Sequence, residues 1–423
     1  MISLNKGILR IEGNKENTAR WIYELTFIVN TITLFAFNDV KFIGTATGLV
    51  MLVAVMLLWI GRRNKKVVIP YNTAWYIAFT AFAAVSCLWS MFINTYMASY
   101  FLRMVVIIAS ITSVSIYVDK AEDLERLIKI FVFSIVIIVA MELAVTPIDQ
   151  WSAGVMGSHF SGANQNSVAF LVFCAELFAF YEFYSKGKKK YILLVALFVV
   201  FVVMSGSRKA MFAAVAGPLL FVFFSIYKRN YLFRILLIAG LAALVIFIIM
   251  NDSNAYNAIG KRFESMLEFW FEDRSHKVDN SLYMRSYYIQ LAQDMFGESP
   301  IIGKGMGNFA KIIDAYYDVQ GVYSHNNYWQ ILSELGIIGF FIYYSMYAFI
   351  IIKLIKNAVV HKSRLSLMFL TFMLLLIVLE TGFVTYNSKM PHIVIAIAYT
   401  ATYATDTDGR KYSYIENQRT GDL

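Results

Sequence analysis

The sequence is poor in charged residues: only 15% of its 423 residues are Asp, Glu, Lys or Arg, while 59% are apolar. A soluble domain carries about 25% charged residues, so the composition excludes a soluble multidomain enzyme. It also excludes a disordered chain, which needs low hydrophobicity. The two cysteines, Cys87 and Cys174, lie in apolar runs. Neither a secreted disulfide scaffold nor a cysteine metal site is therefore expected.

Basic residues exceed acidic ones, and the formal net charge is +9. In a soluble protein this excess would favour nucleic-acid binding. Here no basic patch is combined with a motif that reads nucleic acid, so no nucleic-acid partner is expected. The basic residues cluster instead in short segments between apolar runs, as the positive-inside rule requires.

Long apolar runs recur along the whole chain, and runs of about 18 or more residues predict membrane helices. The first 20 residues are polar and precede a run long enough to remain as an anchor, so a cleavable signal peptide is not expected. The expected fold is an all-α polytopic membrane protein with about twelve transmembrane helices. The predicted spans are 21–37, 40–60, 71–93, 98–118, 127–145, 166–184, 190–205, 210–227, 231–250, 328–352, 365–385 and 390–404.

The distribution of Lys and Arg predicts the orientation. With the N-terminus in the cytoplasm, 25 of them fall in inner segments and four in the short outer segments. This asymmetry places both termini in the cytoplasm and the long segment 251–327 outside. The chain is then divided into an N-terminal bundle of about nine helices, an extracytoplasmic loop, about three C-terminal helices and a cytoplasmic tail. Their ranges are 1–250, 251–327, 328–404 and 405–423.

The outer loop contains short helical patterns. Residues 261–274 have apolar side chains at helical spacing with acidic residues between them, which predicts a helix lying in the membrane interface. A second helix is expected at about 282–296, followed by Pro300 and the glycine-rich turn 303–307. Ser324 is expected to cap the helix that re-enters the membrane.

Charged residues within the spans are few and costly, at about 2.5–3.5 kcal/mol each on insertion scales. A lone intramembrane glutamate is more often a helix-packing contact or an ion-pair partner than a catalyst. All of the charged residues within the spans except Glu176 fall in the outer halves of their helices. This favours a site at the outer leaflet over a proton path. These residues are Arg103, Glu142, Glu176, Glu334 and Glu380.

Three further polar residues lie near the same face. Arg208 is at the outer end of the seventh-to-eighth hairpin, Arg285 is in the large loop, and His325 is where that loop re-enters. The alternative reading of Arg208 is an interfacial anchor, and that of His325 is a helix cap. No spacing predicts a metal site, and Asp406-Thr-Asp408 lies in a polar tail without a surrounding domain.

The run SHNNYWQILSELGIIG at 324–339 closely resembles the signature of the O-antigen ligase/polymerase superfamily. Three weaker stretches resemble family motifs in the expected order: FSGANQNSVA at 160–169, SGSRKA at 205–210, and Arg285 followed by PIIGKGMGNF at 300–309. The resemblance covers about residues 155–345. Lys209 and Ala210 depart from the pattern, in which small or aliphatic residues commonly follow the arginine.

This resemblance implies a metal-independent, inverting glycosyltransferase of GT-C type without a cofactor. Such enzymes take a glycan from undecaprenyl diphosphate in the outer leaflet of the bacterial cytoplasmic membrane and transfer it to an acceptor hydroxyl. The resemblance implies that Arg208 and Arg285 bind the diphosphate, and guanidinium groups suit phosphate oxygens. His325 is the general base. The supporting residues are Arg103, Asn166 and Glu334.

The expected function is polymerisation of lipid-linked repeat units into capsule, exopolysaccharide or O-antigen. The alternative within the family is a ligase, which transfers the finished glycan to a different acceptor by the same chemistry. A third possibility is a transporter of lipid-linked glycans or solutes, although no inverted repeat is found. The expected partners are the lipid-linked donor, the glycan acceptor, and a flippase and chain-length regulator of the same pathway.

Overall fold

The structure is a computed structural model, and it describes residues 2–36, 41–61, 69–90, 92, 95–150, 157, 164–225, 280–319 and 321–404. These residues form helices joined by short turns, with no strand among them. The helices are α1 (Ile2–Ala36), α2 (Lys41–Gly61), α3 (Tyr71–Val85), α4 (Thr95–Tyr117), α5 (Ala121–Val145), α6 (Gln165–Lys186), α7 (Tyr191–Met204), α8 (Arg208–Ser225), α12 (Asn280–Glu298), α13 (Asn308–Tyr317), α14 (Asn327–Val360), α15 (Arg364–Leu379) and α16 (Lys389–Ala404).

The all-helical, polytopic character agrees with the expectation. Helices α4, α5, α6, α8 and α14 are long and apolar enough to cross a membrane, and α2, α7 and α15 contain shorter apolar stretches. Eleven of the twelve predicted spans overlap helices of the structure. The span predicted at 231–250, the interfacial helix at 261–274 and the tail 405–423 lie outside the described residues, so the count of twelve stays a prediction.

The outer surface of the bundle is apolar. Large apolar side chains point away from it, among them Leu193 (74% exposed), Phe341 (67%) and Ile352 (65%). A soluble monomer rarely exposes extended apolar patches, whereas lipid tails tolerate them. This surface agrees with a protein that lies in a membrane.

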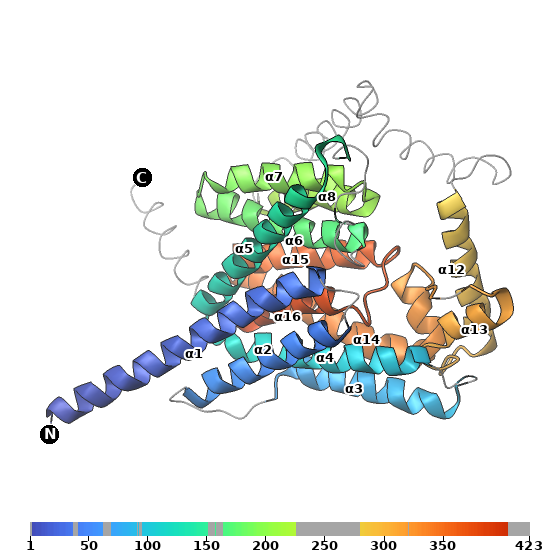
Figure 1. Ribbon diagram of the computed structural model, residues 1–423, viewed down its shortest axis with the longest axis horizontal. Coiled ribbons are helices and arrows are strands. Elements are labelled where there is room, and N and C mark those ends of the chain that lie inside the picture. Colours follow the sequence, from blue (N-terminus) through green and yellow to red (C-terminus); the bar gives the residue numbers. More distant parts are fainter. Residues whose placement is uncertain are drawn as a thin grey trace.

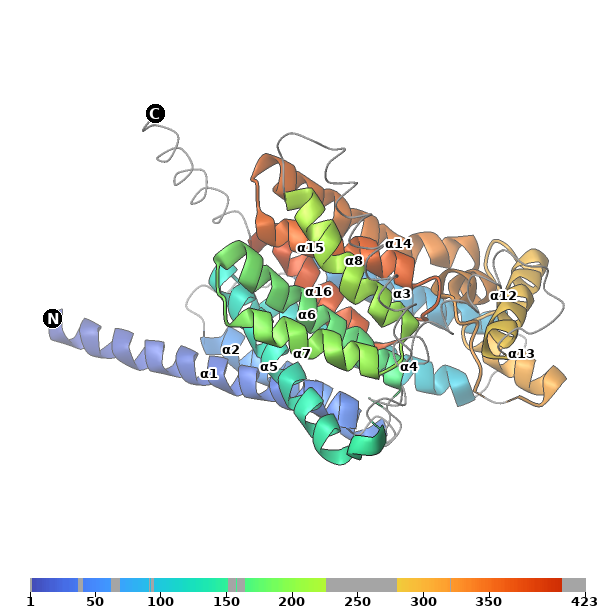
Figure 2. The ribbon, with the colours of Figure 1, turned by 90° about the horizontal axis from the view of Figure 1, so that it is seen from above.

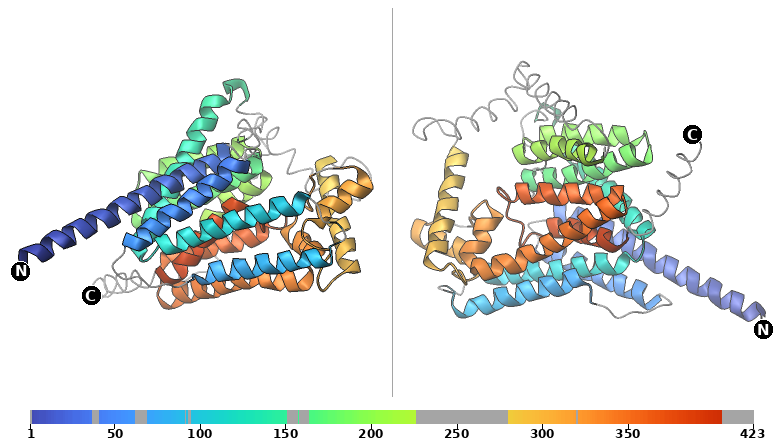
Figure 3. Two further views of the ribbon diagram at one scale, coloured as in Figure 1. Left: turned by 60° about the horizontal axis from the view of Figure 1, so that its bottom comes forward. Right: turned by 180° about the vertical axis from the view of Figure 1, so that it is seen from behind.

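Helices from both ends of the chain lie side by side in the bundle. Helix α4 packs against α2 and α16, while α6 packs against α7, α8 and α15. Figures 1 and 3 show most of these helices running along the long axis of the molecule, with α12 and α13 at one end. The N-terminal part of α1 projects from the opposite end (Figure 1).

Helices α12 and α13 have a small core of their own. Tyr288 and Met295 of α12 pack with Phe309 and Ile313 of α13, and Trp329 at the start of α14 borders this cluster. Figure 2 shows α12 and α13 together at the end of the bundle. Helix α12 extends over 280–298, so the second loop helix predicted at 282–296 is confirmed. The cluster fixes this pair of helices over the end of α14.

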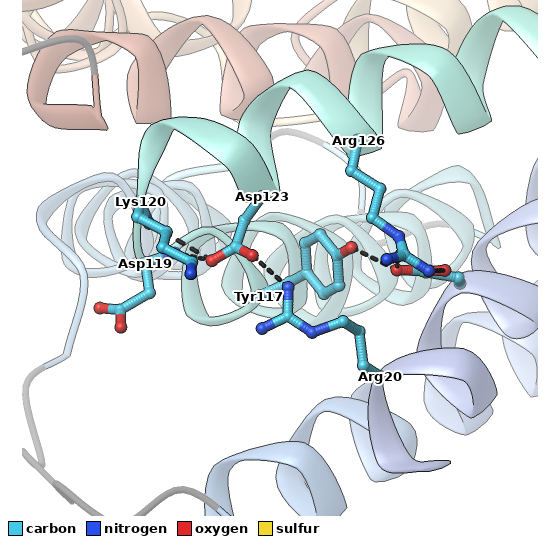
Figure 4. A network of polar contacts seen from close by, with 7 residues as sticks. Arg20, Tyr117, Asp119, Lys120, Asp123 and Arg126 are labelled. Atoms are coloured by element: carbon cyan, nitrogen blue, oxygen red, sulfur yellow. Dashed lines mark hydrogen bonds and ion pairs between the residues drawn. The ribbon is translucent and has the colours of Figure 1, made fainter. Parts of the chain in front are cut away.

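A polar network joins α1 to the start of α5 (Figure 4). Arg20 forms an ion pair with Asp123, and Asp123 also accepts the backbone amides of Asp119 and Lys120 at 3.2 and 3.3 Å. Tyr117, at the C-terminal end of α4, lies beside this network. It is about 20 Å along the helix from Arg103, because an α-helix rises 1.5 Å per residue. The network therefore secures the end of the bundle that is distant from α12 and α13.

Candidate functional site

The chain enters α14 through a hydrogen-bonded turn. The side chain of Asn326 accepts a hydrogen bond from the backbone nitrogen of Trp329 at 3.1 Å and caps the helix. Ser324, the expected cap, instead donates its hydroxyl to the carbonyl of Asn326 at 2.7 Å. The expectation for Ser324 is wrong because helical backbone begins only at Asn327, and the residue just before it supplies the cap.

His325 has a backbone conformation that other residues hold in place. Its φ of 59° lies in the left-handed region, which costs a non-glycine residue roughly 1–2 kcal/mol. The preceding amide, that of Ser324, donates to Gln330 Oε1 at 2.7 Å. The following side chain, that of Asn326, donates through Nδ2 to the carbonyl of Thr381 at 3.2 Å. Fixed neighbours on both sides thus hold the backbone of His325 in this conformation.

Two tyrosines enclose the ring of His325. The ring centroid of Tyr323 lies 4.1 Å away, and that of Tyr288 lies 6.2 Å away in a stacked arrangement. Tyr288 belongs to α12, so the small core of α12 and α13 also determines the position of the imidazole.

Arg208 and Lys209 reach the site from the first turn of α8. The turn before the helix contains Gly206 at φ 66°, a conformation that glycine adopts without steric cost. Lys209 donates to the carbonyl of Gly382, and its ammonium lies 4.4 Å from the ring centroid of Phe383. Lys209, the departure from the family pattern, is therefore part of the site. Sequence reasoning assigned it no role.

The cations and the imidazole come together from distant parts of the chain. Burial, followed by the positive charges of Arg285 and Lys209, lowers the pKa of His325 from 6.5 to about 4. Lys209 in turn interacts electrostatically with both Arg285 and Arg208. In the described part of the chain, no ion pair involves Arg285 or Lys209. We call Arg208, Lys209, Arg285 and His325 the cationic cluster. Its positive charges repel one another, and a bound anion would relieve that repulsion.

Glu334 lies under the glycine-rich turn, where it accepts hydrogen bonds. Its Oε1 accepts the amide of Phe309 at 3.3 Å and Gln330 Nε2 at 3.1 Å, and its Oε2 accepts the Tyr386 hydroxyl at 2.7 Å. The side chain is fully buried. Glu334 thus supports the loop that leads to α13, and the same Gln330 holds the amide of Ser324.

The turn at 300–305 pairs with a break in α14. Gly336 has φ 63° and ψ −168°, so the helical hydrogen bonds are interrupted there. The amides of Lys304 and Gly305 donate to the carbonyls of Ser333 and Glu334 at 2.9 and 2.8 Å. In the other direction, the amides that follow Gly336 donate to the carbonyls of residues 300 and 301. The loop therefore satisfies the backbone groups that the break leaves open.

Asn327 joins the start of α14 to the segment 380–386. Its amide donates to the carbonyl of Glu380 at 2.9 Å, and its Oδ1 accepts the amides of Thr385 and Tyr386 at 2.9 and 3.0 Å. The same segment carries the Gly382 carbonyl that holds Lys209. The two consecutive asparagines of the motif thus connect the imidazole and the ammonium through one short segment.

Arg103 lines a cavity next to the cationic cluster, whereas Asn166 does not line it. Arg103 borders a cavity of about 430 Å³ that also exposes Lys389. Asn164 and Ser167 line this cavity, but Asn166 does not. The amide of Asn166 donates to Asn164 Oδ1 at 2.9 Å, which caps α6. The structure therefore places Asn164 and Ser167, rather than Asn166, where a ligand would touch them. The described residues include no group of three His, Cys, Asp or Glu side chains suited to a metal ion.

A comparison with known families gives one match. Residues 192–344 match the family model described as O-antigen ligase. The matched segment includes the whole cationic cluster and Glu334, and it ends within α14. No curated protein matches the chain. This match over residues 192–344 supports the O-antigen ligase/polymerase superfamily that the sequence motifs indicate.

Proposed function

We propose that this protein is a membrane glycosyltransferase that polymerises undecaprenyl-diphosphate-linked oligosaccharide repeat units on the outer face of the bacterial cytoplasmic membrane. The observation that carries the proposal is the meeting of Arg285 and Lys209 with His325, with Arg208 next to Lys209 at the start of α8. Three cations beside one neutral base suit a reaction that expels a diphosphate and deprotonates a hydroxyl.

The cations bind the donor and stabilise its leaving group. A glycosyl diphosphate has oxygens that two guanidinium groups can hold with paired hydrogen bonds. As the glycosidic bond to the diphosphate breaks, negative charge grows on the leaving oxygen. Arg208, Lys209 and Arg285 stabilise that charge in a region partly shielded from water, where such interactions are strong.

His325 accepts the proton of the acceptor hydroxyl. The hydroxyl oxygen forms a bond to the anomeric carbon while the bond from that carbon to the diphosphate oxygen breaks. The proton passes to the unprotonated nitrogen of His325, and the prenyl diphosphate leaves with the bonding electron pair. Attack opposite the leaving group inverts the anomeric configuration, and His325 then returns its proton to water.

Donor binding adjusts the basicity of His325. With the site empty, burial and the adjacent cations keep the pKa of the imidazole near 4. A bound diphosphate brings negative charges that offset Arg285 and Lys209, so it raises this pKa. The imidazole is then a stronger base when the donor is present.

Reconstitution of the purified protein with one synthetic lipid-linked repeat unit tests the proposal. A ladder of products is expected, and His325→Gln and Arg285→Gln should each lower its rate by about 100-fold or more. Lys356→Gln is the matched control, because it removes one exposed cation from the far half of α14. An undiminished ladder in His325→Gln would contradict the mechanism. Transfer to a different added acceptor without a ladder would identify a ligase, and movement of units across the membrane without transfer would identify a transporter.

A further inference from the structure

A second cationic site lies beside the first one. The cavity of about 430 Å³ is bordered by the C-terminal end of α1, the N-terminal parts of α4 and α6, and residues 383–391. Two of its lining residues are cations, Arg103 and Lys389, and none of the described residues that line it is acidic. The cavity size is within the usual range of small-molecule sites, roughly 300–1,000 Å³.

The two cations of the cavity have no acidic partner among the described residues. Arg103 and Lys389 interact electrostatically with each other. The guanidinium of Arg103 lies 5.8 Å from the ring centroid of Tyr100. Neither residue takes part in an ion pair within the described ranges. Two like charges facing one cavity repel each other, and a bound anion would offset this repulsion.

The rest of the lining suits a lipid with a phosphate head group. Asn164, Ser167 and Asn387 add polar groups that can form hydrogen bonds with phosphate oxygens. Apolar side chains such as Leu34 and Phe170 complete the wall. Paired cations, hydrogen-bonding groups and an apolar surface together match a prenyl diphosphate.

Phe383 connects the cavity with the cationic cluster. Its ring lines the cavity and also carries the ammonium of Lys209 at 4.4 Å. The segment that contains Phe383 forms hydrogen bonds with Asn326 and Asn327, the two residues that follow His325. A ligand in the cavity is therefore next to the groups that bind the donor and accept the proton.

We propose that Arg103 and Lys389 hold the diphosphate of the acceptor, a second lipid-linked repeat unit, while Arg208, Lys209 and Arg285 hold that of the donor. This inference rests on the proposed function and deepens it, because an enzyme that joins two lipid-linked units must bind two prenyl diphosphates at once. Separate subsites keep the two lipids apart and bring the acceptor hydroxyl toward His325.

A two-substrate assay tests the acceptor role. The donor carries a blocked acceptor hydroxyl, so it serves only as donor, and the acceptor concentration is varied. The double variant Arg103→Gln with Lys389→Gln should raise the KM for the lipid-diphosphate acceptor by about tenfold or more, with the donor KM and kcat within about twofold. Lys389→Arg, which keeps the charge, should retain most acceptor binding. An unchanged acceptor KM, or a rise in donor KM instead, would overturn the proposal.

A binding measurement separates this inference from the proposed function. In the Arg208→Gln, Arg285→Gln background, a short prenyl diphosphate should still bind one site in nanodiscs of neutral phospholipid. Adding Arg103→Gln and Lys389→Gln should remove that binding. Absence of the residual site overturns the acceptor subsite even if the wild-type protein makes polymer. The proposal is also overturned if adding phosphatidylglycerol to the nanodiscs abolishes the binding of the prenyl diphosphate to the residual site. The cavity would then bind phospholipid head groups in general.

Discussion

The amide of Gly305 donates a hydrogen bond of 2.8 Å to the carbonyl of Glu334. This bond exists because α14 is broken at Gly336, which frees the carbonyl from its helical partner. The glycine-rich turn and the break in the helix are thus two parts of one structure. It supports α13, and the side chain of Gln330 extends this support to the amide of Ser324, beside His325.

Gly303→Ala should destabilise the protein strongly. A Cβ atom at this position would lie 2.3 Å from the backbone carbonyl carbon of Glu334, and the φ of Gly303 is +68°. Steric overlap with backbone and an unfavourable conformation act together, so we expect a loss of about 3 kcal/mol or more. Thermal unfolding in detergent, followed by tryptophan fluorescence, measures the change.

Gly297→Ala is the matched control for this substitution. A Cβ at Gly297 meets no atom within 4 Å, and the residue is in α12. Alanine favours the helix over glycine by about 1 kcal/mol, so stability should be unchanged or slightly increased. Equal stability of the two variants would contradict the close contact between the turn and α14.

Glu334→Ala should lower stability more than Glu334→Gln does. Alanine leaves the Phe309 amide, the Gln330 side chain and the Tyr386 hydroxyl without their buried acceptor, and each such loss costs about 1–3 kcal/mol. Glutamine keeps one acceptor oxygen and can donate to Tyr386. Thermal unfolding should rank the proteins wild type, Glu334→Gln, Glu334→Ala. A Glu334→Gln variant that is stable but catalytically dead would point instead to a direct chemical role.

The sequence predicted the helices well because long apolar runs and clustered basic residues are local signals. It predicted Arg208, Arg285 and His325 near one membrane face, because each of them lies in a loop or at the end of a predicted span. The structure brings Arg285 to His325, and Lys209, the neighbour of Arg208, to both of them, which loop position alone does not require. The chemical role of each stays a prediction.

The residues that sequence reasoning missed depend on contacts between distant segments. Lys209 was noted only as a departure from the family pattern, because its contacts with Gly382 and Phe383 span more than 170 positions. Lys389 had no motif, and it gains meaning only when α16 and α4 lie side by side. Asn327 stood within the recognised motif, but its bonds to Thr385 and Tyr386 are equally non-local.

Asp123→Asn should reduce stability without changing catalysis by the folded protein. The substitution removes the charge that pairs with Arg20, and it weakens the bonds to the amides of Asp119 and Lys120. Breaking a buried ion pair costs about 3–5 kcal/mol, and the partial exposure of Arg20 favours the lower end. The unfolding temperature should fall, while kcat per folded molecule stays constant. A selective fall in kcat would show that this distant end of the bundle influences the site.

The acid limb of the pH profile should report the charges around His325. Its surroundings are the rings of Tyr288 and Tyr323 and the cations Arg285 and Lys209. Because a base must be unprotonated, kcat/KM should fall only as the pH drops toward 4, the pKa of the free site. The acid limb of the kcat profile should lie at higher pH than that of kcat/KM, since the bound diphosphate favours the imidazolium form of His325.

Lys209→Gln isolates the electrostatic part of this effect. The glutamine amide can still donate to the Gly382 carbonyl, but it removes a positive charge that disfavours the imidazolium. The pKa of His325 should therefore rise toward 6.5, and the acid limb of kcat/KM should move to higher pH. Lys356→Gln, far along α14, should leave the limb in place. A limb that stays fixed or moves to lower pH in Lys209→Gln would mean that the ammonium does not act on the imidazole, and the general base would then have to be sought elsewhere.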